Sequence, residues 1–139
     1  AGTIAGKLFH RRLTNAALPK VGDWVAVTPL PGEAKAVIHA VLPRRSKLAR
    51  KVAGRESEEQ VVAANLDTAF IVQALDQSFN PRRLERFLVM AHEGGTRTVV
   101  LLNKADLCPE VDEPLALARA AAGDAPVLLV SAKTRKGLG

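Results

Sequence analysis

The chain of 139 residues is 47% hydrophobic and has a net charge of +6, so it can bury a core and is not expected to be disordered. No apolar run approaches the length of a transmembrane helix, and the N-terminal residues have no signal-peptide pattern. The single cysteine excludes an internal disulfide and a cysteine-rich zinc site. These features predict a soluble, cytoplasmic protein without a membrane partner.

The net charge is concentrated in the first half of the chain. Residues 1–65 contain 11 Lys and Arg against 5 Asp and Glu, whereas residues 66–139 contain 9 of each kind. Such asymmetry predicts two modules, of which the first faces a polyanion.

The first module, residues 1–65, is predicted to be all-β. The stretches GTIAGKLF, GDWVAVTPL, AKAVIHAVL and QVVAAN have the apolar patterns of short strands and are separated by Pro- and Gly-containing turns. Trp24, in the second stretch, is assigned to the core. Short strands without a long helix are typical of a small barrel or sandwich.

The second module, residues 66–139, is predicted to contain a parallel sheet. Apolar runs at 68–75, 98–102 and 126–130 are typical of strands that are covered on both faces. Helical patterns separate these runs, so the order is β-α-β-α-β, and right-handed crossovers then make the strands parallel.

Local signals predict where the two helices begin and end. Asn80 is a favourable N-cap, and Pro81 suits the first helical position because its missing N–H would be unpaired there. Gly94–Gly95 can supply a left-handed C-cap. Pro114 is predicted to open the second helix, and Gly123 to close it.

Polar residues follow two neighbouring strands at the points where these strands end. Because ligands of parallel α/β sheets bind outside the carboxyl ends of the strands, the two segments are expected to form one site. The candidate residues are Asn103, Lys104, Asp106, Ser131, Ala132 and Lys133.

These residue types suit the recognition of guanine. The Asp106 carboxylate can accept from the adjacent N1–H and N2 amino donors of the base, whereas adenine would leave it unpaired. The Asn103 amide is assigned to the N7 side of the base and to the neighbouring loops. The Lys104 and Lys133 stems are assigned to the two faces of the base, and the Ala132 backbone N–H to O6. The alternative is an Asx-type turn that caps the next helix.

The N-K-A-D and S-A-K segments resemble the two base-contacting motifs of P-loop GTPases. In ordinary members a phosphate loop, G-x-x-x-x-G-K-S/T, precedes the first motif, but that pattern does not occur in this sequence and a basic, strand-rich module lies upstream instead. This order resembles the circularly permuted GTPases, and almost the whole chain, from GDWVAV to VLLVSAKTRKGLG, is similar to the ribosome small subunit-dependent GTPase A family, called RsgA or YjeQ. The resemblance implies guanine-contacting roles for Asn103, Lys104, Asp106, Ser131 and Ala132.

The resemblance also implies a fold and a function. The family has an N-terminal OB-fold, then a permuted GTPase domain and a zinc-binding domain, and it hydrolyses GTP on the small ribosomal subunit during late maturation. The expected fold class is therefore a two-module α+β chain, in which an all-β OB-fold barrel precedes part of a GTPase-like parallel sheet. The expected partners are the small ribosomal subunit with its rRNA and a guanine nucleotide (GTP or GDP), with the protein as a monomer.

Against this family pattern the chain is expected to be a fragment that begins after the first barrel strand and ends before the phosphate loop. It is expected to contain no catalytic or metal-binding residue of its own, so Mg²⁺ and zinc belong only to the full-length parent. The fragment is expected not to hydrolyse GTP and to bind it weakly. Strand 68–75 would then be an exposed apolar edge.

A basic cluster in the first module is the candidate nucleic-acid surface. OB-type barrels combine cations with stacking groups, and the scarcity of stacking groups here favours recognition of RNA backbone and shape. The alternative for residues 44–51 is a solvated basic loop, and the alternative function is an RNA-binding module with a non-catalytic α/β scaffold. The cluster comprises Arg11, Arg12, Arg44, Arg45, Lys47, Arg50 and Lys51.

Overall fold

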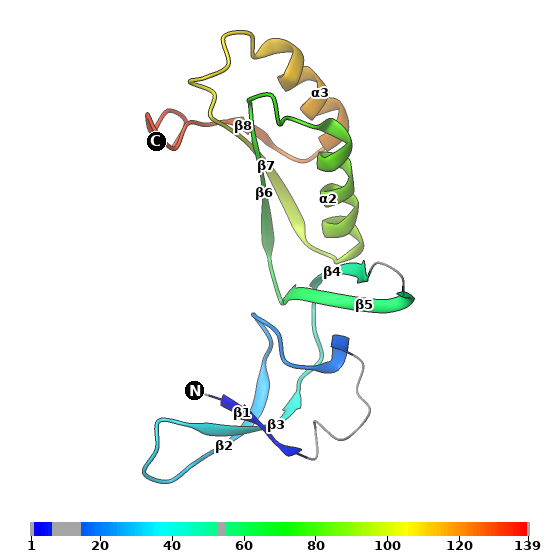
Figure 1. Ribbon diagram of the computed structural model, residues 1–139, viewed down its shortest axis with the longest axis vertical. Coiled ribbons are helices and arrows are strands. Elements are labelled where there is room, and N and C mark those ends of the chain that lie inside the picture. Colours follow the sequence, from blue (N-terminus) through cyan, green and yellow to red (C-terminus); the bar gives the residue numbers. More distant parts are fainter. Residues whose placement is uncertain (1, 7–14, 53–54, 139) are drawn as a thin grey trace. The chain divides into compact units, whose positions relative to one another are not determined.

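The structure is a computed structural model that describes residues 2–6, 15–52 and 55–138 (Figure 1). The chain divides into two compact units, Ala1–Leu66 and Asp67–Gly139. The predicted mixed α+β class is confirmed, since strands and two α-helices are present. None of the described helices is long and apolar enough to cross a membrane.

The first unit contains five strands and one short 3₁₀ helix in its described residues. In one sheet β1 is parallel and β2 antiparallel to the central β3, while β4 and β5 form a separate antiparallel pair. Within the described residues these strands form two sheets and not one closed barrel. The elements are β1 (Gly2–Ile4), η1 (Asn15–Ala17), β2 (Val25–Pro29), β3 (Ala36–Val41), β4 (Lys47–Val52) and β5 (Arg55–Ala64).

Two features of the first unit differ from the prediction. The basic stretch, for which a solvated loop was the alternative, contains strand β4, and cross-strand pairing with β5 gives its cations polar partners such as Glu59 and Gln60. Trp24 is 69% exposed and is not a core residue. The period-2 pattern assigned Trp24 to one face of a strand, but it cannot tell whether that face is covered, and most of β2 is exposed.

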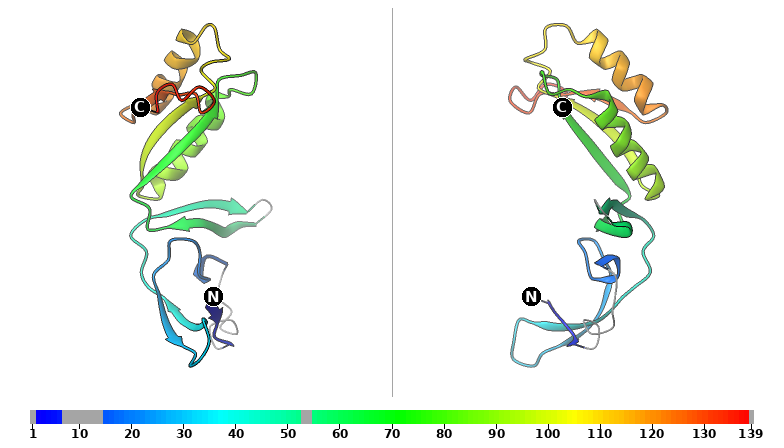
Figure 2. Two further views of the ribbon diagram at one scale, coloured as in Figure 1. Left: turned by 90° about the vertical axis from the view of Figure 1, so that its left-hand side faces the viewer. Right: turned by 45° about the vertical axis from the view of Figure 1, so that its right-hand side comes forward.

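The second unit is a three-stranded parallel sheet with two helices. The order β6-β7-β8 follows the sequence and confirms the predicted β-α-β-α-β arrangement. Two right-handed crossovers in the same direction place both helices on one face of the sheet, as Figures 1 and 2 show. The elements are β6 (Thr68–Ala74), α2 (Pro81–Glu93), β7 (Arg97–Asn103), α3 (Asp112–Ala122) and β8 (Val127–Leu129).

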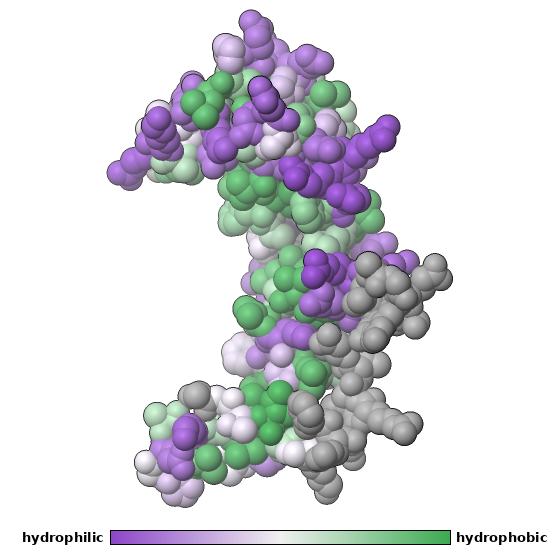
Figure 3. Space-filling model, viewed as in Figure 1, coloured by the Kyte–Doolittle hydropathy of each residue, from purple (hydrophilic) through white to green (hydrophobic). Residues whose placement is uncertain are grey.

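The core of the second unit lies between this helical layer and the sheet. Side chains of β6 alternate between buried and exposed, so this strand is not covered on both faces as predicted. Phe70 and Val72 are 64% and 57% exposed on the edge strand β6, which agrees with the expected apolar edge. Figure 3 shows hydrophobic side chains gathered on the surface over β6. The buried cluster comprises Ile71, Leu75, Leu84, Val100, Leu102 and Ala118.

The helix boundaries follow the local signals with one exception. Asn80 caps α2, because its side chain accepts a hydrogen bond from the Arg83 backbone N–H at 3.1 Å, and Gly95 adopts the left-handed conformation (φ 68°) after the helix. Helix α3 begins at Asp112, two residues before the predicted Pro114. Proline is tolerated within a first turn because the N–H groups there have no intrahelical acceptor.

Candidate functional site

Polar side chains from three loops meet at the carboxyl edge of the β6-β7-β8 sheet. Residues 104–111 and 130–138 follow β7 and β8 and contain nearly all of the residues assigned to the base. One side-chain hydrogen bond joins these two loops, and a second joins the loop after β8 to the last residue of β7. A third contact joins the loop after β6, residues 75–80, to the loop after β7. The prediction that the two polar segments lie side by side is therefore confirmed.

Asn103, the last residue of β7, ties the loops together. Its Oδ1 accepts hydrogen bonds from the backbone N–H of Lys104 at 2.8 Å and from that of Ala132 at 3.0 Å. This agrees with the loop-tying role assigned to the Asn103 amide. The Ala132 N–H, which was assigned to the base O6, is donated to Asn103 in this structure.

Asp106 presents an oriented carboxylate. It is exposed, and its Oδ1 accepts a hydrogen bond at 2.5 Å from the hydroxyl of Ser131, which is fully buried. This hydrogen bond, and more weakly the charge of Lys133, holds the pKa of Asp106 below its ordinary value. The carboxylate is therefore ionised at neutral pH and is fixed on one side while it faces solvent on the other.

The loop after β8 is folded back onto its own strand. The Ser131 backbone N–H donates to the Lys136 carbonyl at 2.9 Å, and its hydroxyl oxygen accepts from the Thr134 N–H at 3.1 Å. Gly137 allows this closure, because at its φ of 74° a Cβ atom would lie 2.4 Å from the Leu129 carbonyl oxygen. Gly137 was not among the predicted site residues, although a glycine shortly after a buried strand is a signal for a close backbone approach.

A residue outside the assigned set, Asp76, also reaches the site. Its Oδ2 lies 2.7 Å from the Lys104 Nζ, and its Oδ1 accepts from the Ser78 backbone N–H at 2.9 Å. The Lys104 ammonium, followed by Ser78, holds the pKa of Asp76 far below its ordinary value. Asp76 could have been predicted from the sequence as a site residue, because it follows a strand that lies beside β7 and such strands end at the same edge of the sheet.

The basic cluster of the first unit is divided by the structure into residues with different surroundings. Arg11 and Arg12 lie outside the described residues. Arg45, Arg50 and Lys51 are exposed, and Lys47 is partly exposed. Lys47 forms an ion pair with Glu59, and the Arg50 Nε donates to the Gln60 side chain at 2.9 Å.

Arg44 has an internal role in this unit. Its guanidinium donates to both carboxylate oxygens of Asp23 at 2.7 Å and to the carbonyls of Ala16 and Leu18 at 2.6 and 3.1 Å. The Asp23 and Arg44 side chains are only 1% and 16% exposed. This bidentate pair lowers the pKa of Asp23. The predicted contact between Arg44 and nucleic acid has no support in this geometry, because the guanidinium is already bound within the unit.

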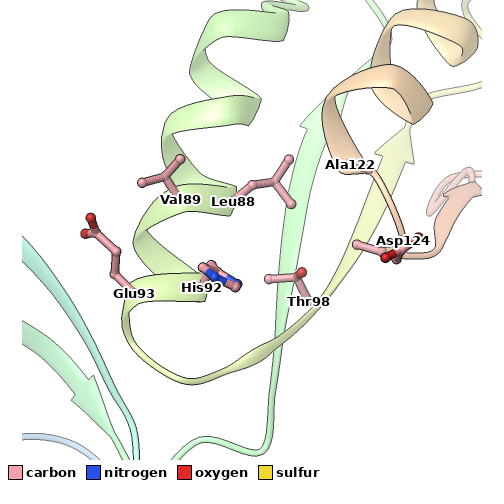
Figure 4. A pocket seen from close by; sticks show the side chains of 8 residues that line it. Leu88, Val89, His92, Glu93, Thr98, Ala122 and Asp124 are labelled. Atoms are coloured by element: carbon pink, nitrogen blue, oxygen red, sulfur yellow. The ribbon is translucent and has the colours of Figure 1, made fainter.

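A cavity of about 500 Å³ lies at the opposite end of the second unit, between the C-terminal ends of α2 and α3. Figure 4 shows His92 beside Thr98 at this cavity, whereas the Glu93 carboxylate points away from these two side chains. None of the residues assigned to the base lines this cavity. In the part of the chain that the structure describes, no group of three or more His, Cys, Asp or Glu side chains is arranged to hold a metal. The described residues therefore do not supply a ligand set that fits the zinc ion implied by the family resemblance.

Comparison with known proteins relates most of the chain to one family. Residues 41–139 match the model of the RsgA GTPase family. The chain is 44% identical over 144 residues to the small ribosomal subunit biogenesis GTPase RsgA of Opitutus terrae. The match covers 98% of this chain but only 39% of that relative's length.

Two solved structures have a similar fold. The crystal structure of YjeQ from Thermotoga maritima matches with a TM-score of 0.67 and 28% identity, over 99% of this chain and 45% of that one. The structure of YloQ, described as a circularly permuted GTPase, matches with a TM-score of 0.56 and 22% identity, over 91% of this chain and 41% of that one. The second likeness concerns the fold alone.

Proposed function

The chain belongs to the RsgA GTPase family, and from this premise we propose that the carboxyl edge of its parallel sheet binds the guanine base of GTP and GDP. The observation that carries the proposal is the Asp106 carboxylate, which is exposed, ionised and held by the buried Ser131 hydroxyl. An acceptor of this kind matches a base edge with two adjacent donors.

The neighbouring residues complete the proposed base site. Asn103 faces the N7 side of the base, and the stems of Lys104 and Lys133 cover its two faces. The Ala132 N–H is then shared between Asn103 and the base O6. Adenine has an amino group at the position of O6 and lacks both donors, N1–H and the N2 amino group, that Asp106 accepts, so it leaves polar groups on both sides unpaired.

For the whole protein we propose GTP hydrolysis in the biogenesis of the small ribosomal subunit. The support is the name of the Opitutus terrae relative, of which this chain spans about 39%. A phosphate-loop pattern does not occur in these 139 residues, so the proposal for this sequence is limited to recognition of the base. The 139 residues alone are expected to lack GTPase activity.

We further propose that residues 1–65 form an OB-fold domain that contacts rRNA, and that residues 66–139 form the base-binding part of the GTPase domain. The exposed cations Arg45, Arg50 and Lys51, with Lys47, are the proposed contacts on the first domain. The protein is proposed to be cytoplasmic and monomeric. Because these contacts are ionic, RNA affinity should fall steeply with salt concentration.

Competition between nucleotides tests the base site. In the protein made from its complete reading frame, GDP is expected to displace a fluorescent guanine nucleotide and ADP is not. Asp106→Asn replaces one acceptor by a donor, so GDP affinity should fall by at least about a hundredfold. Xanthine presents a donor and an acceptor along the same edge, so xanthosine diphosphate should bind this variant better than GDP does.

The matched control is Asp124→Asn, an exposed carboxylate at the cavity on the opposite end of the sheet, which should leave GDP affinity unchanged. Equal binding of GDP and ADP by the wild-type protein would contradict the proposal. Salt-sensitive RNA binding without nucleotide binding would support the alternative, an RNA-binding module with an α/β scaffold.

A further inference from the structure

The proposed base site is supported by a residue in the loop after the neighbouring strand β6, outside the two base-contacting motifs. We propose that Asp76 is a positioning residue that holds the Lys104 stem in place to receive one face of the guanine base. This inference rests on the proposed function, because it concerns the same site. It names a residue in the loop after β6 as a determinant of nucleotide affinity.

The backbone of Lys104 is held in an unusual conformation. Its φ of 62° lies in the left-handed region, which residues with a Cβ adopt only when their surroundings enforce it. The Lys104 N–H donates to the Asn103 side chain, and its carbonyl accepts from the Leu107 N–H at 2.9 Å. These two backbone contacts fix the direction in which the Lys104 side chain leaves the main chain.

The far end of the Lys104 side chain is fixed by Asp76. The ammonium lies 2.7 Å from Asp76 Oδ2, and the two side chains are 49% and 31% exposed. With both its backbone and its charged end bound, the intervening methylene stem has few remaining conformations. A stem that is ordered before the base arrives loses less conformational entropy on binding than a free lysine would.

Asp76 is itself held firmly enough to act as an anchor. Its other oxygen accepts from the Ser78 N–H at 2.9 Å, and the Ser78 carbonyl accepts from the Arg83 guanidinium at 2.7 Å. The backbone N–H of Leu75, just before it, donates to the Asn103 carbonyl at 2.7 Å, so the ends of β6 and β7 remain paired. The low pKa of Asp76 keeps the anchor charged at all physiological pH values.

The substitution Asp76→Asn distinguishes the role of Asp76 in the ion pair with Lys104 from its role in the turn with Ser78. The amide oxygen of asparagine can still accept from the Ser78 N–H, so the turn is retained, whereas the charge that holds Lys104 is lost. GDP affinity of the protein made from its complete reading frame is expected to fall about threefold, as suits a partly exposed pair. Asp76→Glu, which keeps the charge, should restore most of the affinity.

A double-mutant cycle identifies the route by which Asp76 acts. Lys104→Met keeps an apolar stem but removes the ammonium, so adding Asp76→Asn to this variant should change GDP affinity no further. A merely structural role of Asp76 would produce the same loss with or without the lysine, and that result would overturn the inference, as would unchanged affinity in the single Asp76→Asn variant. If the wild-type protein does not bind GDP, the proposed function itself fails, and this inference falls with it.

Discussion

The two units of the chain are stabilised by different kinds of interaction. Among the described residues, twelve are buried in the second unit and only three, Ser46, Val61 and Ala64, in the first. The second unit has an apolar core between one sheet face and two helices. The first has large apolar side chains at the surface, including Val21 at 78% and Trp24 at 69% exposure. It also encloses the ion pair between Arg44 and Asp23, whose side chains are 16% and 1% exposed.

This contrast shows that apolar content does not by itself make a core. Strands β2 and β3 are as rich in Val, Ile and Ala as the strands of the second unit, but β2 has no buried residue. Backbone pairing and one bidentate ion pair therefore supply much of the order in the first unit. The two units should respond differently to the loss of an apolar side chain and to the loss of a charge.

The largest expected effect is the loss of a core side chain from the second unit. Leu84 on α2 is fully buried, so Leu84→Ala leaves a cavity and should lower the free energy of unfolding of this unit by about 3 kcal/mol. Amide hydrogen exchange measures the effect separately in each unit. Protection should fall in β6 and β7 and remain unchanged in β2 and β3.

The matched control for Leu84 lies on the same helix. Val89 is 55% exposed, and Val89→Ala should change the free energy of unfolding by no more than about 0.5 kcal/mol. Equal losses for the two substitutions would mean that the second unit does not depend on the core described above.

The second expected effect is the loss of the enclosed charge pair of the first unit. Asp23→Asn leaves the Arg44 guanidinium enclosed without a counter-charge and should cost this unit about 2 kcal/mol. Protection of β2 and β3 amides should fall, while that of β6 and β7 should not. Glu33→Gln is the matched control, since its pair with Lys35 is about half exposed and should contribute no more than about 0.5 kcal/mol.

The elements that could be predicted from the sequence are those with local signals. Helix α2 begins where Asn80 and Pro81 indicate, because an N-cap acts on the N–H groups of the same turn. The parallel order of β6, β7 and β8 follows from alternation of strands and helices along the chain. The juxtaposition of Asn103 with Ala132 follows from that order, since neighbouring parallel strands end at the same edge.

The features that could not be predicted depend on partners far away in the sequence. Lys47 belongs to a strand because residues of β5 pair with it, and a run of cations does not reveal this. Arg44 stands in a run of cations in the sequence, and its partner Asp23 lies 21 residues earlier, too far for a local pattern to reveal the pair. Trp24 was misassigned for the related reason that burial is a property of the assembled unit.

A third effect, smaller than that of the Asp23 substitution, is expected on acidification. The pKa of Asp23 is lowered in the folded state, mainly by Arg44. The stability that Asp23 contributes is therefore complete above its unfolded pKa of about 3.9 and is lost as the pH falls through the lower folded value. The difference in protection between wild type and Asp23→Asn should be constant between pH 5 and 7 and shrink below about pH 4. A difference that does not change with pH would show that the carboxylate charge is not what stabilises the unit.

The smallest expected effect is on the exposed ion pair of the β4–β5 hairpin. The Lys47 and Glu59 side chains are 42% and 44% exposed, so Lys47→Met should lower the free energy of unfolding by no more than about 0.5 kcal/mol. A loss as large as that of Asp23→Asn would break the distinction between enclosed and exposed pairs in this unit. The weakness of this ion pair also bears on RNA binding, because a phosphate group of RNA can replace the Glu59 carboxylate as the partner of Lys47 at little cost in free energy. Lys47→Met should therefore lower the salt dependence of RNA binding by about one phosphate contact in a protein that remains folded, whereas Lys35→Met should leave it unchanged.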